Sequence, residues 1–242
     1  MAYKNVPPSE QKSPFAAVLN SNCQIEIASK VSVGSNVVLG PRCNAIRIGY
    51  GSRIGRDIYI DVEELEIGEY TTIHHGSIFH GIKTSIGHNC WIGHYTIIDS
   101  LGGLARIGNN VGIGAHSQLW THMKFGDMLA GCRWNKSGLL DIEDDVWFVG
   151  HCIVSPIKAK SRSMLMVGSL LTKDMEENAI YAGSPAANVT EKFGNQFYET
   201  DISEREVMFR KLKKDFYKKT GLDTSTLVGV TEFPYEGMNN KH

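Results

Sequence analysis

Apolar side chains recur at about every sixth position through most of the chain. Within the regular runs most steps are six residues, a few are five or seven, and the step from Ile98 to Ile107 is nine. Neither the roughly 3.6-residue period of a helix nor the alternation of a single strand accounts for this spacing. The repeating positions are Ile25, Val31, Val37, Ile48, Ile54, Ile60, Ile67, Ile73, Phe79, Ile86, Ile92, Ile98, Ile107, Ile113, Leu119, Ile142, Phe148, Val154 and Val167.

Glycine is common directly after the repeating apolar residue, as at Gly49, Gly68 and Gly87. A short strand followed by a tight corner explains both features, because the strand needs an inward apolar side chain and the corner needs a small residue. Three repeats would make one triangular coil of about 18 residues, with apolar side chains stacked inside at the ~4.8 Å strand spacing. We therefore predict an all-β parallel β-helix with roughly seven coils between Ile25 and Lys173. The pattern does not fix the hand of the coil.

The repeat divides the chain into three parts. Residues 1–20 are predicted to form an N-terminal arm, and residues 21–189 the β-helix domain. Residues 121–141 interrupt this domain without any six-residue repeat, and a loop of this length in a compact domain usually has a function. Residues 190–242 are predicted to form a small helical segment and a tail.

The C-terminal segment is predicted to contain a basic helix. Ser203 and Glu206 form a capping-box pattern, and Gly221 stands where the helix would end. Residues 205–219 hold seven Lys or Arg and two acidic residues, a local charge of +5. We expect the charges to face solvent and the apolar side to pack on the end of the coil; attraction to a phosphate-bearing ligand or an anionic surface is the alternative. The apolar side consists of Phe209, Leu212 and Phe216.

Composition narrows the compartment and the classes of partner. The 242 residues are 42% hydrophobic and carry a formal net charge of -1, which does not favour a nucleic-acid partner. The N-terminal residues lack the apolar core of a signal peptide, and no stretch reaches the ~18 uninterrupted apolar residues of a membrane span. The five cysteines are scattered without a CxxC pair, which suits reduced thiols. We expect a cytoplasmic protein.

Three stretches in the second half of the chain carry a recognisable pattern: ARIGNNVGIGAHSQLWTHMKFGD, DIEDDVWFVGHCIVSP and VGSLLTKDMEENAIYAGSPAANV. Through them, residues 104–189 resemble the hexapeptide-repeat acyltransferases, and most closely the sugar and xenobiotic O-acetyltransferases related to galactoside and maltose acetyltransferase. The family's closing pattern is matched by Gly168–Ser169, by Thr172–Lys173–Asp174 and by Gly183–Ser184–Pro185–Ala186.

This resemblance implies several properties that the residues alone do not. The coil would be left-handed. The enzyme would take acetyl-CoA or another acyl-CoA as co-substrate, with no required metal, and would work as a homotrimer. The acceptor would be a small molecule or a glycan, as in polysaccharide biosynthesis.

The resemblance also assigns candidate site residues. His122 follows a T-H step at the base of the long loop, where the family has its catalytic histidine. Trp147 matches a tryptophan that lines the cleft, and Asp99 resembles an aspartate that helps to hold the acceptor, although its spacing differs. The positions that match coenzyme contacts are Gly150, Val167, Gly168, Thr172 and Lys173.

Two departures from the family bear on the coenzyme. The closing turn is usually followed by a Lys or Arg, and here that position is Ala187. The usual P-G-V-x-I-G is replaced by a stretch that contains Lys158 and Lys160, with Arg162 nearby. These three basic residues are candidates for the missing contact with the coenzyme phosphates, and a solvated edge is the alternative.

Histidine suits the chemistry that acyl transfer requires. Its unperturbed pKa of ~6.5 lets the neutral ring accept a proton near neutral pH. His122 would take the proton from an acceptor hydroxyl or amine as that group attacks the thioester, and direct transfer needs no nucleophilic Ser or Cys. His94 and His116 are candidate cleft residues near coil corners, and His151 is expected to be structural.

Two other functions are compatible with the same coil. A gamma-class carbonic anhydrase is suggested by Gly87-His88-Asn89-Cys90 followed by His94, but Ser52 stands where a third histidine would be needed. A non-catalytic scaffold is the second alternative, and the T-H step and the long loop argue against it.

Overall fold

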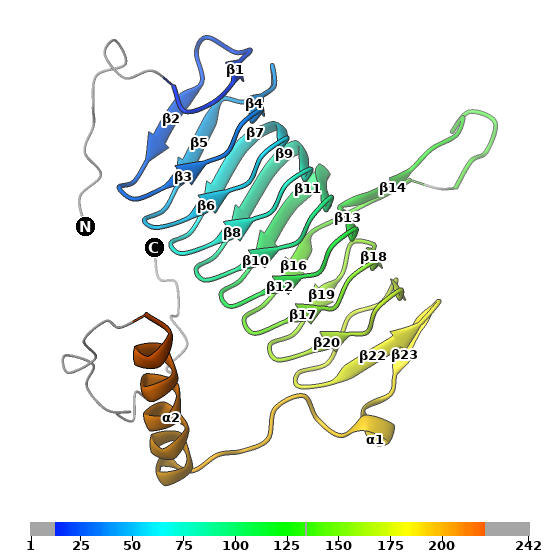
Figure 1. The fold of residues 1–242 in the computed structure, drawn as a ribbon. Coiled ribbons are helices and arrows are strands. Elements are labelled where there is room, and N and C mark those ends of the chain that lie inside the picture. The colour runs from blue at the N-terminus through cyan, green and yellow to red at the C-terminus, as the bar shows by residue number, and fades with distance from the viewer. Residues whose placement is uncertain (1–12, 134, 221–242) are drawn as a thin grey trace, which may run out of the picture. The chain divides into compact units, whose positions relative to one another are not determined.

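The computed structural model describes residues 13–133 and 135–220 of the chain. Two units are present, residues 1–196 and residues 197–242. The first is a parallel β-solenoid in which short strands stack coil on coil (Figure 1). The predicted all-β parallel β-helix is therefore confirmed.

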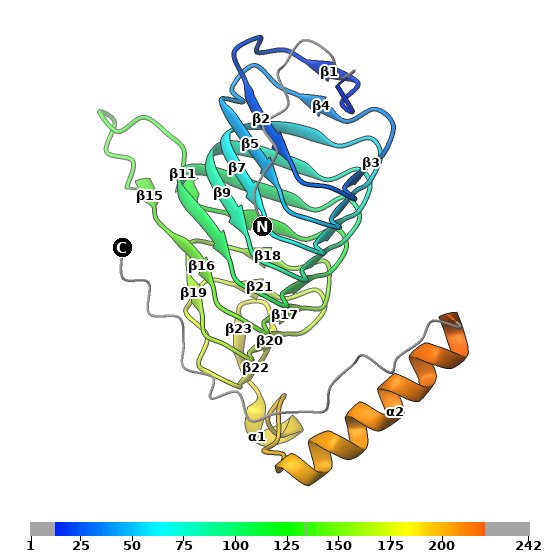
Figure 2. The ribbon, with the colours of Figure 1, turned by 90° about the vertical axis from the view of Figure 1, so that its left-hand side faces the viewer.

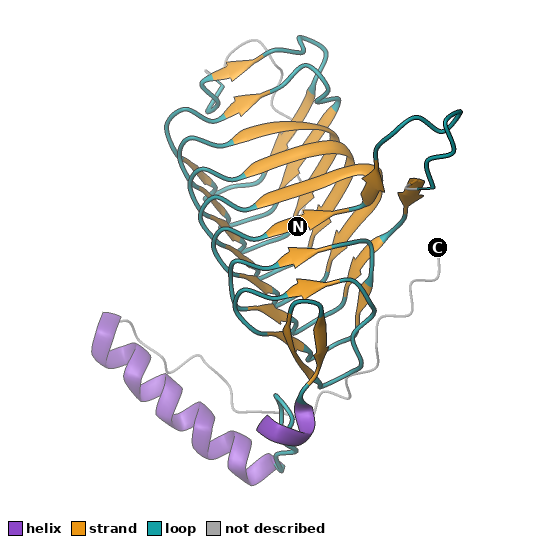
Figure 3. Ribbon diagram, turned by 90° about the vertical axis from the view of Figure 1, so that its right-hand side faces the viewer, coloured by secondary structure: helices purple, strands orange, loops and turns teal. Residues whose placement is uncertain are grey.

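Each coil of the solenoid contributes strand segments to three faces (Figures 2 and 3). The first face contains β1 (Ala17–Val18), β4 (Val38–Leu39), the first halves of β7 (Tyr59–Ile67), β9 (Ile78–Ile86) and β11 (Ile97–Ile107), then β13 (Gln118–Trp120), β18 (Ile153–Val154) and β21 (Leu170–Leu171). The second face contains β2 (Gln24–Ile27), β5 (Ala45–Ile48), the second halves of β7, β9 and β11, then β16 (Leu140–Ile142) and β19 (Lys158–Ala159). The third face contains β3 (Ser32–Val33), β6 (Arg53–Ile54), β8 (Thr72–Ile73), β10 (Trp91–Ile92), β12 (Gly112–Ile113), β17 (Trp147–Phe148), β20 (Met164–Leu165), β22 (Ile180–Gly183) and β23 (Ala186–Asn188).

The seven strands from β3 to β20 on the third face agree with the predicted number of coils, and β22 adds one more. The last strand, β23, pairs antiparallel with β22, so the sheet ends in a hairpin. At the other end, β1 pairs with β4. The first strand of the described residues, β1, thus lies inside the segment that the sequence assigned to an N-terminal arm.

Three columns of corner residues separate the faces. The loop edge lies between the first and second faces and contains Asp61, His80 and Asp99, which pair from coil to coil, and Thr121, which follows β13. The asparagine edge lies between the second and third faces and contains Asn89, Asn110, Asp145 and Arg162. The histidine edge lies between the third and first faces and contains His74, His75, His94, Tyr95, His116 and His151.

The repeating apolar side chains fill the interior of the solenoid. Ile60, Phe79 and Ile98 stack on neighbouring coils and are almost completely buried. The glycines that follow such residues permit close stacking: a Cβ on Gly34 would stand 2.7 Å from the Gly55 carbonyl carbon, too close for any side chain. The prediction was wrong at the last repeat, because Val167 is 59% exposed and Leu165 points inward instead.

The nine-residue step between Ile98 and Ile107 corresponds to a bulge in β11. Ser100 pairs with Gly81 and Leu104 with Lys83. Between these two pairs the chain advances by four positions in β11 but by only two in β9. The two extra residues lie at the loop edge.

The predicted loop is a β-hairpin that projects from the loop edge (Figure 1). Its strands are β14 (His122–Lys124) and β15 (Asn135–Ser137), and they pair antiparallel. Its outer part exposes apolar side chains, since Phe125 is 91% and Leu129 100% accessible.

The second unit contains the helix α2 (Ile202–Thr220), preceded in the first unit by the single turn α1 (Thr190–Phe193). A capping box is present two residues earlier than predicted. The Glu204 amide donates to Asp201 Oδ1 at 2.8 Å, and the Asp201 amide donates to Glu204 Oε2 at 3.1 Å. Aspartate accepts this bond as well as serine does, so Asp201 and Glu204 take the place of Ser203 and Glu206. Gly221 lies outside the described residues.

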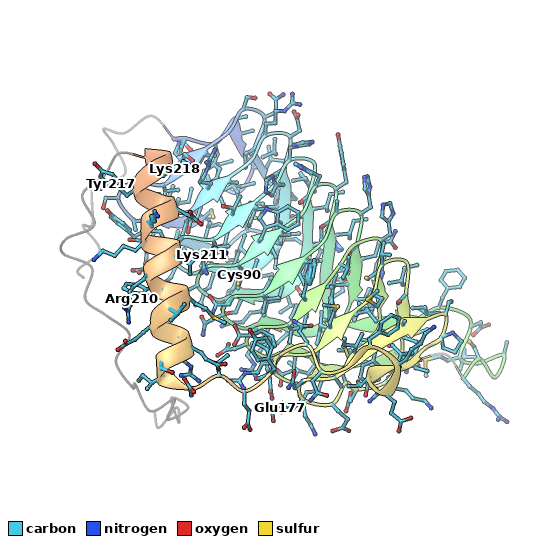
Figure 4. All side chains as sticks on the ribbon, turned by 60° about the horizontal axis from the view of Figure 1, so that its bottom comes forward. Cys90, Glu177, Arg210, Lys211, Tyr217 and Lys218 are labelled. Carbon is cyan, nitrogen blue, oxygen red and sulfur yellow. The ribbon has the colours of Figure 1, made fainter. Side chains whose placement is uncertain are left out.

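Several basic side chains of α2 are exposed, among them Arg210, Lys211 and Lys218 (Figure 4). Leu212, which the sequence placed on a packed apolar stripe, is exposed, and Phe209 is half-buried. Among the described residues no helix is long and apolar enough to cross a membrane.

Candidate active site on the loop edge

The predicted base, His122, lies where the hairpin leaves the solenoid. Thr121 separates it from the end of β13, and it is the first residue of β14, where it pairs with Ser137. Its side chain is 24% exposed, so one side of the ring contacts the protein and the other is open to solvent. The Trp120 ring stands edge-on to it, with centroids 5.9 Å apart. The residue is therefore held at the base of the hairpin and is accessible to a ligand.

Asp99 stands beside His122 and is almost completely buried. Its Oδ1 lies 3.4 Å from His122 Nδ1, close enough for an ion pair but too long and poorly aligned for a hydrogen bond. The same oxygen accepts a hydrogen bond from the Leu101 amide at 2.9 Å, within the bulge of β11. The two residues that the sequence proposed for catalysis and acceptor binding are thus brought together.

His80 completes this group and was not among the residues predicted from the sequence. Its Nδ1 lies 2.9 Å from Asp99 Oδ2, so the carboxylate stands between two imidazoles (a His80–Asp99–His122 row). A signal for His80 was available, because it precedes Asp99 by one coil and the two residues are paired in the parallel register. The coil length would have placed it in the same column.

Close packing at Thr121 and Gly102 fixes the backbone that carries His122. The Thr121 hydroxyl donates to the Asp99 carbonyl at 3.1 Å and accepts from the Gly102 amide at 2.9 Å. A Cβ on Gly102 would stand 2.8 Å from His122 Cβ and closer still to the Thr121 carbonyl oxygen. Only glycine fits at this position beneath His122.

The histidines of the histidine edge form a ladder of rings. The rings of His75 and His94 lie 4.0 Å apart, and the Tyr95, His116 and His151 rings follow at 5.3 and 5.0 Å in stacked pairs. Burial lowers the pKa of His94, and neighbouring His75 lowers it further. His94 and His116, which the sequence proposed as cleft residues, therefore lie together, but on a different edge from His122.

The remaining acceptor candidate, Trp147, lies on the third face. It pairs in register with Gly112, which in turn pairs with Trp91. A Cβ on Gly112 would stand 2.9 Å from Trp147 Cδ1, so the indole lies over the glycine. Trp147 is thus exposed beside the histidine edge and is separated from His122 by the first face.

The candidates for coenzyme binding divide between two edges. Gly150, Val167 and Gly168 belong to the histidine edge, and the last two are exposed. Thr172 and Lys173 follow β21 on the loop edge, on the same column as His122, and are exposed as well. Neither edge alone contains all five candidates for coenzyme binding.

The three unusual basic residues lie elsewhere, on the second face and the asparagine edge. Lys158 Nζ is 2.8 Å from Glu143 Oε1, and Lys160 Nζ is 2.9 Å from Glu176 Oε2. Arg162 stands at the corner that follows. The structure does not bring this group together with the other coenzyme candidates.

The residues that suggested a carbonic anhydrase are also separated. His88 lies on the asparagine edge and His94 on the histidine edge, with β10 between them. The Nδ1 atom of His88 accepts the Glu69 amide at 3.0 Å. In the described part of the chain, no three His, Cys, Asp or Glu side chains are placed to hold a metal ion.

The buried thiols are poorly suited to act as nucleophiles. Cys90 lies inside the solenoid (Figure 4), and burial raises the pKa of its thiol. Burial likewise raises the pKa of Cys43 to about 11. A thiolate is the reactive form of cysteine, so these positions are inert.

Comparisons with known proteins give the following. No protein-family model matches the chain. A protein of Schizosaccharomyces pombe that is provisionally named an acetyltransferase is 32% identical over 112 residues, which are 46% of this chain and 51% of that protein. The chain thus spans about half the length of the curated relative that it matches.

Among solved structures, the polySia-specific acetyltransferase NeuO is 19% identical, with a TM-score of 0.48 and coverage of 86% of this chain and 99% of that one. The polysialic acid O-acetyltransferase OatWY is 18% identical, with a TM-score of 0.45 and coverage of 81% and 98%. AntD of Bacillus cereus, an N-acyltransferase solved with dTDP and 3-hydroxybutyryl-CoA, is 16% identical, with a TM-score of 0.44 and coverage of 85% and 92%. These similarities are too low to assign an activity to the chain.

Proposed function

We propose that this protein is a hexapeptide-repeat acyltransferase that moves an acetyl or other short acyl group from acyl-CoA to a hydroxyl or amine of a sugar-like acceptor. The observation that carries the proposal is the placement of His122 beside the buried Asp99 carboxylate, at the base of a projecting hairpin. The closing motif of the sequence and the S. pombe relative support the same reaction class.

His122 would act as the general base. The Asp99 carboxylate, 3.4 Å from Nδ1, would favour the neutral tautomer with its proton on Nδ1, and Nε2 would then be the proton acceptor. Nε2 takes the proton of the acceptor hydroxyl as that oxygen attacks the thioester carbonyl. The carbon–sulfur bond then breaks, and the proton passes from His122 to the departing CoA sulfur. Backbone amides at the cleft would stabilise the oxyanion.

Asp99 would position His122, in addition to the acceptor-binding role that the sequence suggested. A carboxylate beside a catalytic histidine fixes the tautomer and stabilises the imidazolium that forms during the reaction. Asp99 is suited to this, because it is held in place by the Leu101 amide and is shielded from solvent.

We infer further that the enzyme works as a homotrimer. The loop edge holds His122, Asp99, Thr172 and Lys173. The candidates on or beside the histidine edge are His94, His116, Trp147, Gly150, Val167 and Gly168. The first face separates these two groups on one subunit. In a three-fold assembly, the loop edge of one subunit would meet the histidine edge of the next, and the apolar hairpin tip would be covered.

Within this arrangement Lys173 is the candidate for the coenzyme phosphates. It is exposed on the same edge as His122. Lys158 and Lys160 already have carboxylate partners, so a phosphate would compete with Glu143 and Glu176 for them. We therefore assign these two lysines to an ion-paired surface.

The five free cysteines also support the cytoplasmic location that we propose, since a reducing compartment keeps thiols free. Immunodetection in fractionated cells of the source organism would test this location.

The activity is tested by acetyl-CoA-dependent release of the CoA thiol with a panel of free sugars, nucleotide sugars and sialic-acid polymers. We expect release above hydrolysis with at least one hydroxyl or amino sugar, and mass spectrometry of the product should find one added acetyl group. Release that never exceeds hydrolysis, together with no detectable binding of acetyl-CoA, would favour a scaffold. Light scattering should give about three times 26.8 kDa; a stable monomer would overturn the shared site.

A further inference from the structure

The Asp99 carboxylate is fixed from both of its oxygens. Oδ2 accepts from His80 Nδ1 at 2.9 Å, and Oδ1 accepts from the Leu101 amide at 2.9 Å. A carboxylate bound at both oxygens cannot turn about its Cβ–Cγ bond without breaking one of the bonds. Oδ1 is therefore held beside the His122 ring, 3.4 Å from its Nδ1.

The His80 side chain does not contribute to the core of the solenoid. Phe79, its neighbour in β9, supplies the core side chain of the strand, while the His80 ring is 30% exposed. The carboxylate on the preceding coil, Asp61, is bound by the Arg42 amide at 2.9 Å and by its guanidinium at 3.5 Å. Two separate groups of charged or titratable side chains therefore lie on this part of the loop edge, Arg42 with Asp61, and His80 with Asp99 and His122.

We propose that His80 is a positioning residue that acts through Asp99: it locks the carboxylate in the orientation that sets the tautomer and the ring plane of His122. The inference rests on the proposed function, in which His122 is the base. His80 itself need not touch either substrate, because its bond to Asp99 is made on the side of the carboxylate away from His122.

The matched pair of variants is His80→Ala and His80→Asn. Asparagine places an amide N–H near the position of Nδ1 and keeps a donor to Asp99 without an imidazole. Loss of one hydrogen bond to a charged group corresponds to roughly a tenfold to hundredfold effect. We expect His80→Ala to lower kcat by this amount with the KM for acetyl-CoA unchanged, and His80→Asn to restore most of kcat.

A double-mutant cycle separates action through Asp99 from an independent role. If His80 works only through the carboxylate, His80→Ala added to Asp99→Asn should lower kcat no further than Asp99→Asn alone. A second readout does not depend on the acceptor: nitrogen NMR of ¹⁵N-histidine-labelled protein, with the His122 signals assigned by their loss in His122→Ala. The Nδ1–H tautomer should dominate in the wild type and in His80→Asn, and a tautomer mixture should appear in His80→Ala.

Each failure has its own signature. Wild-type kcat in His80→Ala, effects of His80→Ala and Asp99→Asn that multiply, or an unchanged His122 tautomer in His80→Ala would overturn the positioning role. Full activity in His122→Ala would instead overturn the proposed base, while the tautomer measurement would still report whether His80 orients Asp99.

Discussion

Gly102 offers a test of how closely the loop edge must hold His122. An alanine there would place its Cβ 2.8 Å from His122 Cβ and 2.8 Å from the Thr121 carbonyl carbon. Ordinary contact begins at 3.4 Å, so both atoms must retreat by at least 0.6 Å (3.4 minus 2.8), and the Thr121 carbonyl oxygen, which is closer still, must move further. His122 Cβ is attached directly to the backbone and cannot swing away, so the backbone that carries the base must shift.

The size of the effect follows from that displacement. Catalytic groups tolerate misplacement of about 0.5 Å, and a shift near 1 Å can cost ~100-fold. We expect Gly102→Ala to lower kcat roughly tenfold to hundredfold, with acetyl-CoA affinity nearly unchanged, because the coenzyme candidates lie on other coils. The assay is CoA release at saturating acetyl-CoA and acceptor, alongside the melting temperature and the oligomeric mass.

Gly138→Ala is the matched control, because Gly138 directly follows β15, where the second strand of the hairpin returns to the solenoid. Its Cβ would meet only Pro156 Cβ, at 3.2 Å, so a shift of about 0.2 Å suffices (3.4 minus 3.2). This variant should keep kcat within a few-fold of the wild type. If Gly102→Ala is as active as Gly138→Ala, the position of His122 at this edge does not limit the reaction.

Three further outcomes are expected. Asp99→Asn should lower kcat by at least ~100-fold with little change in the KM of the acceptor, because the tautomer of the base is lost; a change confined to the acceptor KM would assign Asp99 to binding instead. Lys173→Glu should raise the KM for acetyl-CoA several-fold at low salt, whereas the paired Lys160→Glu should not; equal effects would contradict the assignment. The melting temperature should fall as the pH drops below ~6.5, because burial, and then neighbouring histidines, lower the pKa values of His74 and His94, so the unfolded chain binds more protons there. His94→Asn should reduce this slope, and an unchanged slope would exclude His94 as its source.

The core of the solenoid could be predicted because its rule is local. An inward apolar residue every six positions, followed by a small corner residue, describes Ile54–Gly55 and Ile86–Gly87 correctly. The same rule failed at Val167, whose Val-Gly dipeptide imitates the repeat while Leu165, two residues earlier, supplies the buried side chain. A dipeptide pattern does not report which of two nearby aliphatic residues faces inward.

The site could be predicted only in part, since it depends on contacts between coils. His122 was identifiable from the T-H step and the long loop. Its approach to Asp99 depends on the bulge between Ser100 and Leu104, whose conformation no local pattern describes. The separation of Trp147 and His94 from His122 likewise follows from which face each coil position occupies.

The central claim, that His122 is the base of an acyl transfer from acyl-CoA, is tested most directly by His122→Ala. With acetyl-CoA and the best acceptor of the panel, turnover should fall by about 10²–10⁴-fold. Acetyl-CoA affinity, the oligomeric mass and the melting temperature should stay close to those of the wild type. A variant that keeps more than about a tenth of the wild-type turnover, well above that range, would contradict the assignment and leave His94 and His116 as the next candidates.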